Sequence, residues 1–342
     1  MPPLNYSARL SSLTARKSDT ALNESALSKS ASASLLPSDV RYLLESMRAI
    51  GSDYNSRTLE AATRVRNHLE NNLELPVSRT YKTQGSVVTN TNIKLHSDFD
   101  LLAIIDDYHF PETKPINPYT KTEPNSDIRA LRQQSTSIMQ ATYDIVDTSG
   151  EKGISIYNKS LHRKVDLIFC FWYLSSKYQE TQDEFYKGIY LYKFPTGEKI
   201  KDYPFAAIHN INQKGDRTND GSRKAIRLMK NLKADGDNVL KELKSFQLTT
   251  IAHSIPDDQI TYQTVGSEIF IAESVSRQLG NLIRDNDYRK SVKCPKGIEY
   301  PLRDDEIVPS LRSMKEDLDT LVADVKSDLA RSALVKKASL EY

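Results

Sequence analysis

The segment of residues 98–105 has the sequence Asp98-Phe99-Asp100-Leu101-Leu102-Ala103-Ile104-Ile105, in which two aspartates precede an apolar run. Apolar and branched residues in such a short run predict a buried strand. Because side chains alternate across a strand, Asp98 and Asp100 are expected on the same face. A solvated strand end is the alternative interpretation, but an unpaired carboxylate in an apolar setting is costly, which favours a bound cation.

A second apolar strand carries a third aspartate. The segment Lys164-Val165-Asp166-Leu167-Ile168-Phe169 is predicted to run beside the first strand. Three carboxylates on two adjacent strands suit two magnesium ions, which take oxygen ligands and keep positions open for phosphate. His96 lies near these aspartates in the sequence. We interpret it as a polar turn residue, because in two-metal chemistry the cation itself activates the attacking hydroxyl.

A short turn precedes the first aspartate pair. It contains Gln84, Gly85 and Ser86. Glycine lets the backbone come close to a phosphate, and a serine hydroxyl and exposed amides can donate to its oxygens. Taken alone the dipeptide would fit an ordinary turn, so its interpretation depends on the aspartates that follow.

The bulk composition limits the class of protein. The chain has 342 residues, of which 47 are basic and 45 acidic, so its formal charge is only +2. Such a small net charge does not provide a broad basic surface for duplex DNA, so any nucleotide site must be local and no requirement for duplex DNA is expected. The two cysteines, Cys170 and Cys294, are too few for a disulfide framework. They also do not show the Cys/His spacing of a zinc site, so we expect no zinc. The sequence has no apolar run of the roughly 20 residues that span a bilayer. We therefore expect a cytoplasmic protein without a membrane partner.

The chain divides into three expected parts. Residues 1–36 are rich in Ser, Ala and Lys and predict a loose arm or a weak helix. Residues 37–200 predict a catalytic lobe, which begins with two helices and continues with closely spaced strands typical of an antiparallel or mixed sheet. Residues 201–342 predict a helical lobe. Its expected helices are at about 204–213, 220–234, 238–253, 266–285 and 310–331. The fold class is therefore α+β.

The combined motifs resemble a known superfamily. Gly85-Ser86, Asp98-Phe99-Asp100 and Val165-Asp166-Leu167 look like the signature of the DNA polymerase beta nucleotidyltransferases. More narrowly, the chain resembles the bacterial CD-NTases, which are related to cyclic GMP-AMP synthase and oligoadenylate synthase. The resemblance covers about residues 37–330. It implies a polymerase-beta-like lobe with a mixed sheet and a helical lobe that completes the nucleotide cleft.

The resemblance also implies an activity. Such an enzyme joins nucleoside triphosphates into a cyclic di- or trinucleotide second messenger, releases pyrophosphate and signals to a downstream effector in anti-phage defence. Two alternatives remain: nucleotidyl transfer to RNA or protein, and a catalytically silent nucleotide-binding partner. The presence of all three aspartates disfavours the silent partner.

Roles for individual residues follow from the same resemblance. Magnesium, which manganese can replace, is the expected cofactor. The donor triphosphate is expected to contact Lys230 of the segment 227–233 and Ser245 of the segment 244–246. Lys233 and Lys244 are alternatives to Lys230 for this contact. The alternative interpretation of Lys230 is a structural one, in which it lies on a solvated helix face. The catalytic and metal-binding residues implied are Asp98, Asp100 and Asp166, and the residues implied near the phosphates are Gln84, Gly85 and Ser86.

Overall fold

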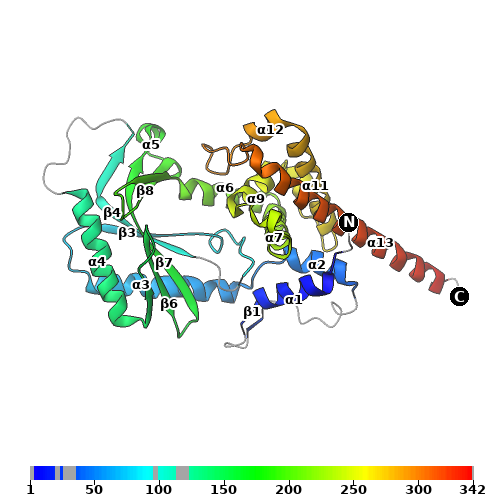
Figure 1. Ribbon diagram of the computed structural model, residues 1–342, viewed down its shortest axis with the longest axis horizontal. Helices are drawn as coiled ribbons and strands as arrows, with labels where there is room; N and C mark the ends of the chain where they lie inside the picture. The colour runs from blue at the N-terminus through cyan, green and yellow to red at the C-terminus, as the bar shows by residue number, and fades with distance from the viewer. Residues whose placement is uncertain (1–3, 20–23, 26–35, 95–98, 113–122, 341–342) are drawn as a thin grey trace. The chain divides into compact units, whose positions relative to one another are not determined.

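The computed structural model describes residues 4–19, 24–25, 36–94, 99–112 and 123–340 (Figure 1). These residues form two compact units, which we call the sheet unit and the helical unit. The sheet unit comprises the segments Gly51–Thr89 and His96–His209, and the helical unit comprises Met1–Ile50, Asn90–Leu95 and Asn210–Tyr342. Helix α6 (Pro204–Arg217) begins in the first and ends in the second.

The sheet unit is built on a mixed sheet. The strands follow the order β3-β4-β7-β6-β5, and β8 pairs with β7 and β9. Only the β4–β7 pair is parallel among the described strands. The strands are β3 (Arg79–Gln84), β4 (Asp100–Pro111), β5 (Ile145–Asp147), β6 (Gly153–Asn158), β7 (Arg163–Leu174), β8 (Lys187–Tyr192) and β9 (Lys199–Asp202). The helices of this unit are α3 (Ser52–Asn72), α4 (Pro124–Thr142), α5 (Ser176–Thr181) and the short 3-10 helix η2 (Glu184–Tyr186).

The two faces of the central strands have different neighbours. On one face the alternate residues Leu101, Ala103 and Ile105 of β4 belong to the same core as Val65 of α3 and Leu131 of α4. Figure 1 shows these two helices alongside the sheet. On the other face Leu102 and Ile104 join a smaller cluster with Cys170, Trp172, Ile189 and Leu191. The alternation of side chains places Asp100 and Asp166 on this second face, away from α3 and α4.

The helical unit packs its helices around one continuous core. Buried leucines of α7, α11 and α13 meet there, among them Leu228, Leu279 and Leu318. Its elements are α1 (Tyr6–Arg16), β1 (Ser18–Asp19), β2 (Glu24–Ser25), α2 (Ser38–Met47), α7 (Gly221–Asp235), α8 (Asn238–Lys241), α9 (Ser245–Ser254), α10 (Asp257–Ile260), α11 (Glu268–Arg284), α12 (Asn286–Ser291), the 3-10 helix η3 (Asp305–Ile307) and α13 (Val308–Leu340).

The predicted helix over 238–253 is two helices in the structure. The side chain of Asp237 accepts from the Leu240 amide at 2.9 Å and begins α8. Lys244 then has extended backbone angles, and its amide donates to the Gln247 side chain at 2.7 Å, which begins α9. Because side chains satisfy the backbone at both starts, a break here costs little. Apolar periodicity alone did not reveal it.

The observed architecture confirms the predicted α+β class with a mixed sheet and a helical region. Within the N-terminal segment expected to be a loose arm or a weak helix, residues 6–16 form α1. This helix buries Leu13 and pairs Arg9 with Asp317 of α13 at 2.5 Å. None of the helices in the described ranges is long and apolar enough to cross a membrane.

Candidate active site

Four polar residues form a row across four neighbouring strands of the sheet. Asp100 at the start of β4 pairs in register with Asp166 of β7. Gln84 at the end of β3 pairs with Asp100, and Ser155 of β6 pairs with Asp166. Residues paired in register point to the same face of a sheet. The row Gln84, Asp100, Asp166 and Ser155 therefore lies on one face, and we call it the polar row.

Neighbouring side chains orient both carboxylates of the polar row. Gln84 Nε2 donates to Asp100 Oδ2 at 2.8 Å. The Ser155 hydroxyl donates to Asp166 Oδ1, and Lys164 Nζ donates to Asp166 Oδ2 at 3.0 Å. The Asp166 side chain is only 17% exposed, so these partners also offset part of its desolvation. Asp98, the third predicted carboxylate, lies outside the described residues, as does His96.

A cavity of about 380 Å³ opens over this row. It is lined by Asp100, Gly150, Glu151, Lys152, Gly153, Ile154, Ser155, Asp166 and Ile168. The lining thus includes three carboxylates, Asp100, Glu151 and Asp166, together with Lys152. Carboxylate oxygens are the ligands that hard divalent cations prefer, so the donor set fits magnesium. Within the described ranges no group of three His, Cys, Asp or Glu side chains is placed to hold a metal ion.

The predicted glycine turn directly follows the polar row. Gly85 comes after the last residue of β3 and has a φ of 112°. A side chain at that angle would strain the backbone, so the turn requires glycine. Ser86 follows in the turn, and its carbonyl accepts from the Thr89 hydroxyl at 3.4 Å. The structure therefore brings Gln84, Gly85 and Ser86 to the same end of the sheet as Asp100.

The two predicted triphosphate contacts belong to the helical unit. Lys230 of α7 is partly buried, and its ammonium donates to the Thr91 carbonyl at 2.9 Å. The lysine therefore does not lie on a solvated helix face. Ser245 is the exposed first residue of α9. A contact of either residue with a triphosphate stays a prediction.

The buried ammonium of Lys230 leads to a pH-dependent expectation. Desolvation lowers its pKa from 10.5 to about 8. Below pH 8 the lysine is charged in the folded and unfolded states alike. Between about pH 8 and 10.5 the unfolded state binds more protons, so the contribution of Lys230 to stability rises with pH by at most about 1.4 kcal/mol per pH unit.

We therefore expect the loss of unfolding free energy caused by Lys230→Met to grow as the pH rises from 8 to 10. Urea unfolding at pH 7, 8, 9 and 10 measures this difference. Lys241→Met, which removes an exposed lysine from the same unit, is the control. If the loss of unfolding free energy in Lys230→Met stays constant or shrinks above pH 8, the pKa of Lys230 is not lowered by burial.

Sequence reasoning missed three residues of the site. Lys164 lies two residues before Asp166, so strand alternation alone was enough to place both on one face. Ser155 lies in β6, and only the β6–β7 register brings it to Asp166. Lys152 lines the cavity from the loop before β6, and no motif in the sequence marks it.

Comparison with known proteins identifies the family of the chain. Residues 209–326 match the family model of the cGAS/DncV-like nucleotidyltransferase C-terminal helical domain. A c-di-GMP synthase from a Lachnospiraceae bacterium is 32% identical over 349 residues, which covers 93% of this chain and 98% of that protein.

Solved structures agree with the fold. A STING-associated CdnE c-di-GMP synthase from Capnocytophaga granulosa superposes with a TM-score of 0.79 at 26% identity, covering 95% of this chain and 99% of that one. A second such synthase, from Flavobacteriaceae sp., has a TM-score of 0.81 at 24% identity, covering 94% and 98%. Since a relative that is 32% identical covers 93% of this chain, the protein belongs to the bacterial CD-NTase family of cGAS/DncV-like nucleotidyltransferases.

Proposed function

We propose that this protein joins two molecules of GTP into cyclic di-GMP and releases two pyrophosphates. The cyclic di-GMP acts as a second messenger in anti-phage signalling. As a member of this family, the protein is a cyclic oligonucleotide synthase. Guanine is supported by three relatives between 28% and 32% identical, each of which is a c-di-GMP synthase. The observation that carries the catalytic assignment is the polar row, where Asp100 and Asp166 stand side by side at a cavity.

Each round of the proposed reaction makes one phosphodiester bond. A ribose hydroxyl of one nucleotide attacks the α-phosphate of the other, the bond to pyrophosphate breaks, and the hydroxyl proton is lost. A second round closes the ring. Asp98, Asp100 and Asp166 would hold the magnesium, or manganese in its place. When bound, the cation offsets the triphosphate charge and lowers the pKa of the attacking hydroxyl.

The chain's own residues position these groups. Gln84 fixes one oxygen of Asp100, and Ser155 with Lys164 fixes both oxygens of Asp166, so the carboxylates are oriented before a ligand binds. Gly85 has no Cβ, which allows a phosphate to come close to its backbone. Lys152 supplies a positive charge at the cavity wall.

The proposal is tested by incubating the protein with each NTP alone and in pairs, with magnesium or manganese, and identifying products by mass. We expect GTP alone to yield cyclic di-GMP, without added DNA. A product that needs a second base contradicts the choice of guanine. Label transferred to RNA or protein instead would support the alternative acceptor, and the absence of any product from all NTP pairs would support a silent nucleotide-binding partner.

A further inference from the structure

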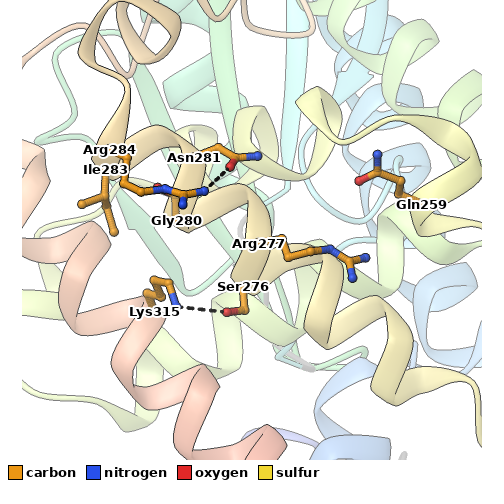
Figure 2. Close-up of a pocket in the computed structure, with 8 residues that line it drawn as sticks. All are labelled: Gln259, Ser276, Arg277, Gly280, Asn281, Ile283, Arg284 and Lys315. Carbon is orange, nitrogen blue, oxygen red and sulfur yellow. Dashed lines mark hydrogen bonds between the residues drawn. The ribbon is translucent and has the colours of Figure 1, made fainter.

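A second cavity, of about 700 Å³, lies entirely within the helical unit (Figure 2). Most of its wall is one face of α11, with Lys315 of α13 opposite and Gln259 of α10 at one side. Its volume is within the range of roughly 300–1,000 Å³ that is typical of small-molecule sites. The lining residues are Gln259, Ser276, Arg277, Gly280, Asn281, Ile283, Arg284 and Lys315. None of them lines the cavity over the polar row.

The charge of this wall is positive. Three of the eight lining residues are cations and none is acidic. Arg277 donates to the Ser274 hydroxyl at 2.8 Å, and Arg284 donates to the Gly280 carbonyl and the Asn281 side chain. These partners are neutral, and neither arginine forms an ion pair with any residue in the described ranges. Both arginines are exposed, so a ligand reaches them without displacing a carboxylate.

Lys315 has a different environment. Its ammonium pairs with the Asp319 carboxylate, and it lies 3.4 Å from the Ser276 hydroxyl. Because Asp319 neutralises Lys315, the positive charge of the cavity wall comes mainly from the two arginines. Guanidinium groups match phosphate and carboxylate oxygens through two parallel hydrogen bonds, which makes them the stronger anion contacts.

A glycine keeps the cavity open. Gly280 lies between the rows of α11 that carry the two arginines and Ser276, and a Cβ there would lie 3.2 Å from Lys315 Cε. A larger side chain at this position would fill the space between α11 and α13. Beside it, Ile283 supplies an apolar contact, and the amides of Gln259 and Asn281 supply both donors and acceptors. The wall is thus built for an organic molecule with charged ends instead of a bare ion.

We propose that this cavity binds a small organic polyanion, a metabolite with at least two phosphate or carboxylate groups. Arg277 and Arg284 lie on one row of α11 and hold separate anionic groups, while Ile283 contacts the organic part. Such a ligand would connect α11 with Lys315 of α13. The site is independent of the proposed reaction, because it shares no residue with the polar row.

Calorimetric titration of the full chain tests the proposal, in buffer freed of divalent cations by a chelating resin so that metal-dependent triphosphate binding is suppressed. The probes are GTP, cyclic di-GMP, citrate and inorganic phosphate. We expect at least one organic polyanion to bind. The double variant Arg277→Gln/Arg284→Gln should weaken that binding at least about tenfold. Gly280→Leu should weaken it while leaving every charge in place.

Arg48→Gln/Arg303→Gln is the matched control, since it removes two exposed arginines elsewhere on the same unit. It should bind like the parent protein. Binding of phosphates but not citrate identifies a phosphorylated ligand, and the reverse identifies a polycarboxylate. The proposal is overturned if no organic probe binds, if inorganic phosphate alone binds, or if the control loses as much affinity as the double variant. Product formation from GTP, assayed on the same preparations, separates failure here from failure of the proposed function.

Discussion

Asp100→Asn and Asp166→Asn should each lower the rate of product formation by at least about a thousandfold, because several kcal/mol of transition-state stabilisation are lost with an anionic metal ligand. The amide keeps the shape of the side chain but removes the charge that holds a divalent cation. Asp98→Asn is expected to have the same effect if the third predicted carboxylate completes the site. The measurement is turnover of GTP with saturating magnesium.

The same variants should remain folded. In the absence of a cation, Asp166 is paired with Lys164, whose side chain is 46% exposed, and such a pair contributes about 0–1 kcal/mol. Asp100 keeps a neutral partner in Gln84 after substitution. The melting temperature should therefore change by only a few degrees, roughly 2–4 °C per kcal/mol.

Asp144→Asn is the control for this experiment. Asp144 is an exposed carboxylate of the sheet unit that pairs with Lys159 at 2.8 Å, so its substitution removes an ion pair without touching the polar row. It should retain normal turnover. If the Asp100 or Asp166 variant turned over GTP at nearly the normal rate, or lost activity only in proportion to unfolded protein, the catalytic assignment would be wrong.

The sequence was sufficient for the elements that carry strong local patterns. The apolar runs around Asp100 and Asp166 predicted β4 and β7, and the prediction that the two strands lie side by side is confirmed by their register. Strand alternation predicted Asp98 and Asp100 on one face, and this stays a prediction because Asp98 lies outside the described residues. Asp100 lies beside Asp166 through the register of β4 with β7. The close succession of strands predicted an antiparallel or mixed sheet, and the sheet is mixed.

Other features depend on contacts between distant segments. Ser155 joins the polar row only through the pairing of β6 with β7, and register between strands is not encoded in either strand alone. Likewise, the helical pattern of 227–233 gave no sign that Arg227 is buried, since a basic residue is usually exposed. Its partners are up to 180 positions away in the sequence.

Arg227 has a strong structural role in the helical unit. Its side chain is 1% exposed. Nε donates to the Met47 carbonyl at 2.6 Å, and Nη1 donates to the Asn90 carbonyl at 2.6 Å. Nη2 pairs with Asp220 at the start of α7. One guanidinium thus joins the end of α2, the segment 90–94 and α7, and its fixed fork serves all three acceptors.

Arg227→Met should therefore lower the free energy of unfolding by about 2–4 kcal/mol, because the two carbonyls and the Asp220 carboxylate all lose their donor. The melting temperature should fall by roughly 5–10 °C. Arg227→Lys should restore less than half of the loss, since an ammonium on a flexible stem cannot reproduce the fork. Thermal and urea unfolding measure both variants.

Lys233→Met, which removes a cation from the same helix, is the control and should cost less than about 1 kcal/mol. Equal losses for Arg227→Met and Lys233→Met would show that general charge, and not the three-way contact, explains the effect.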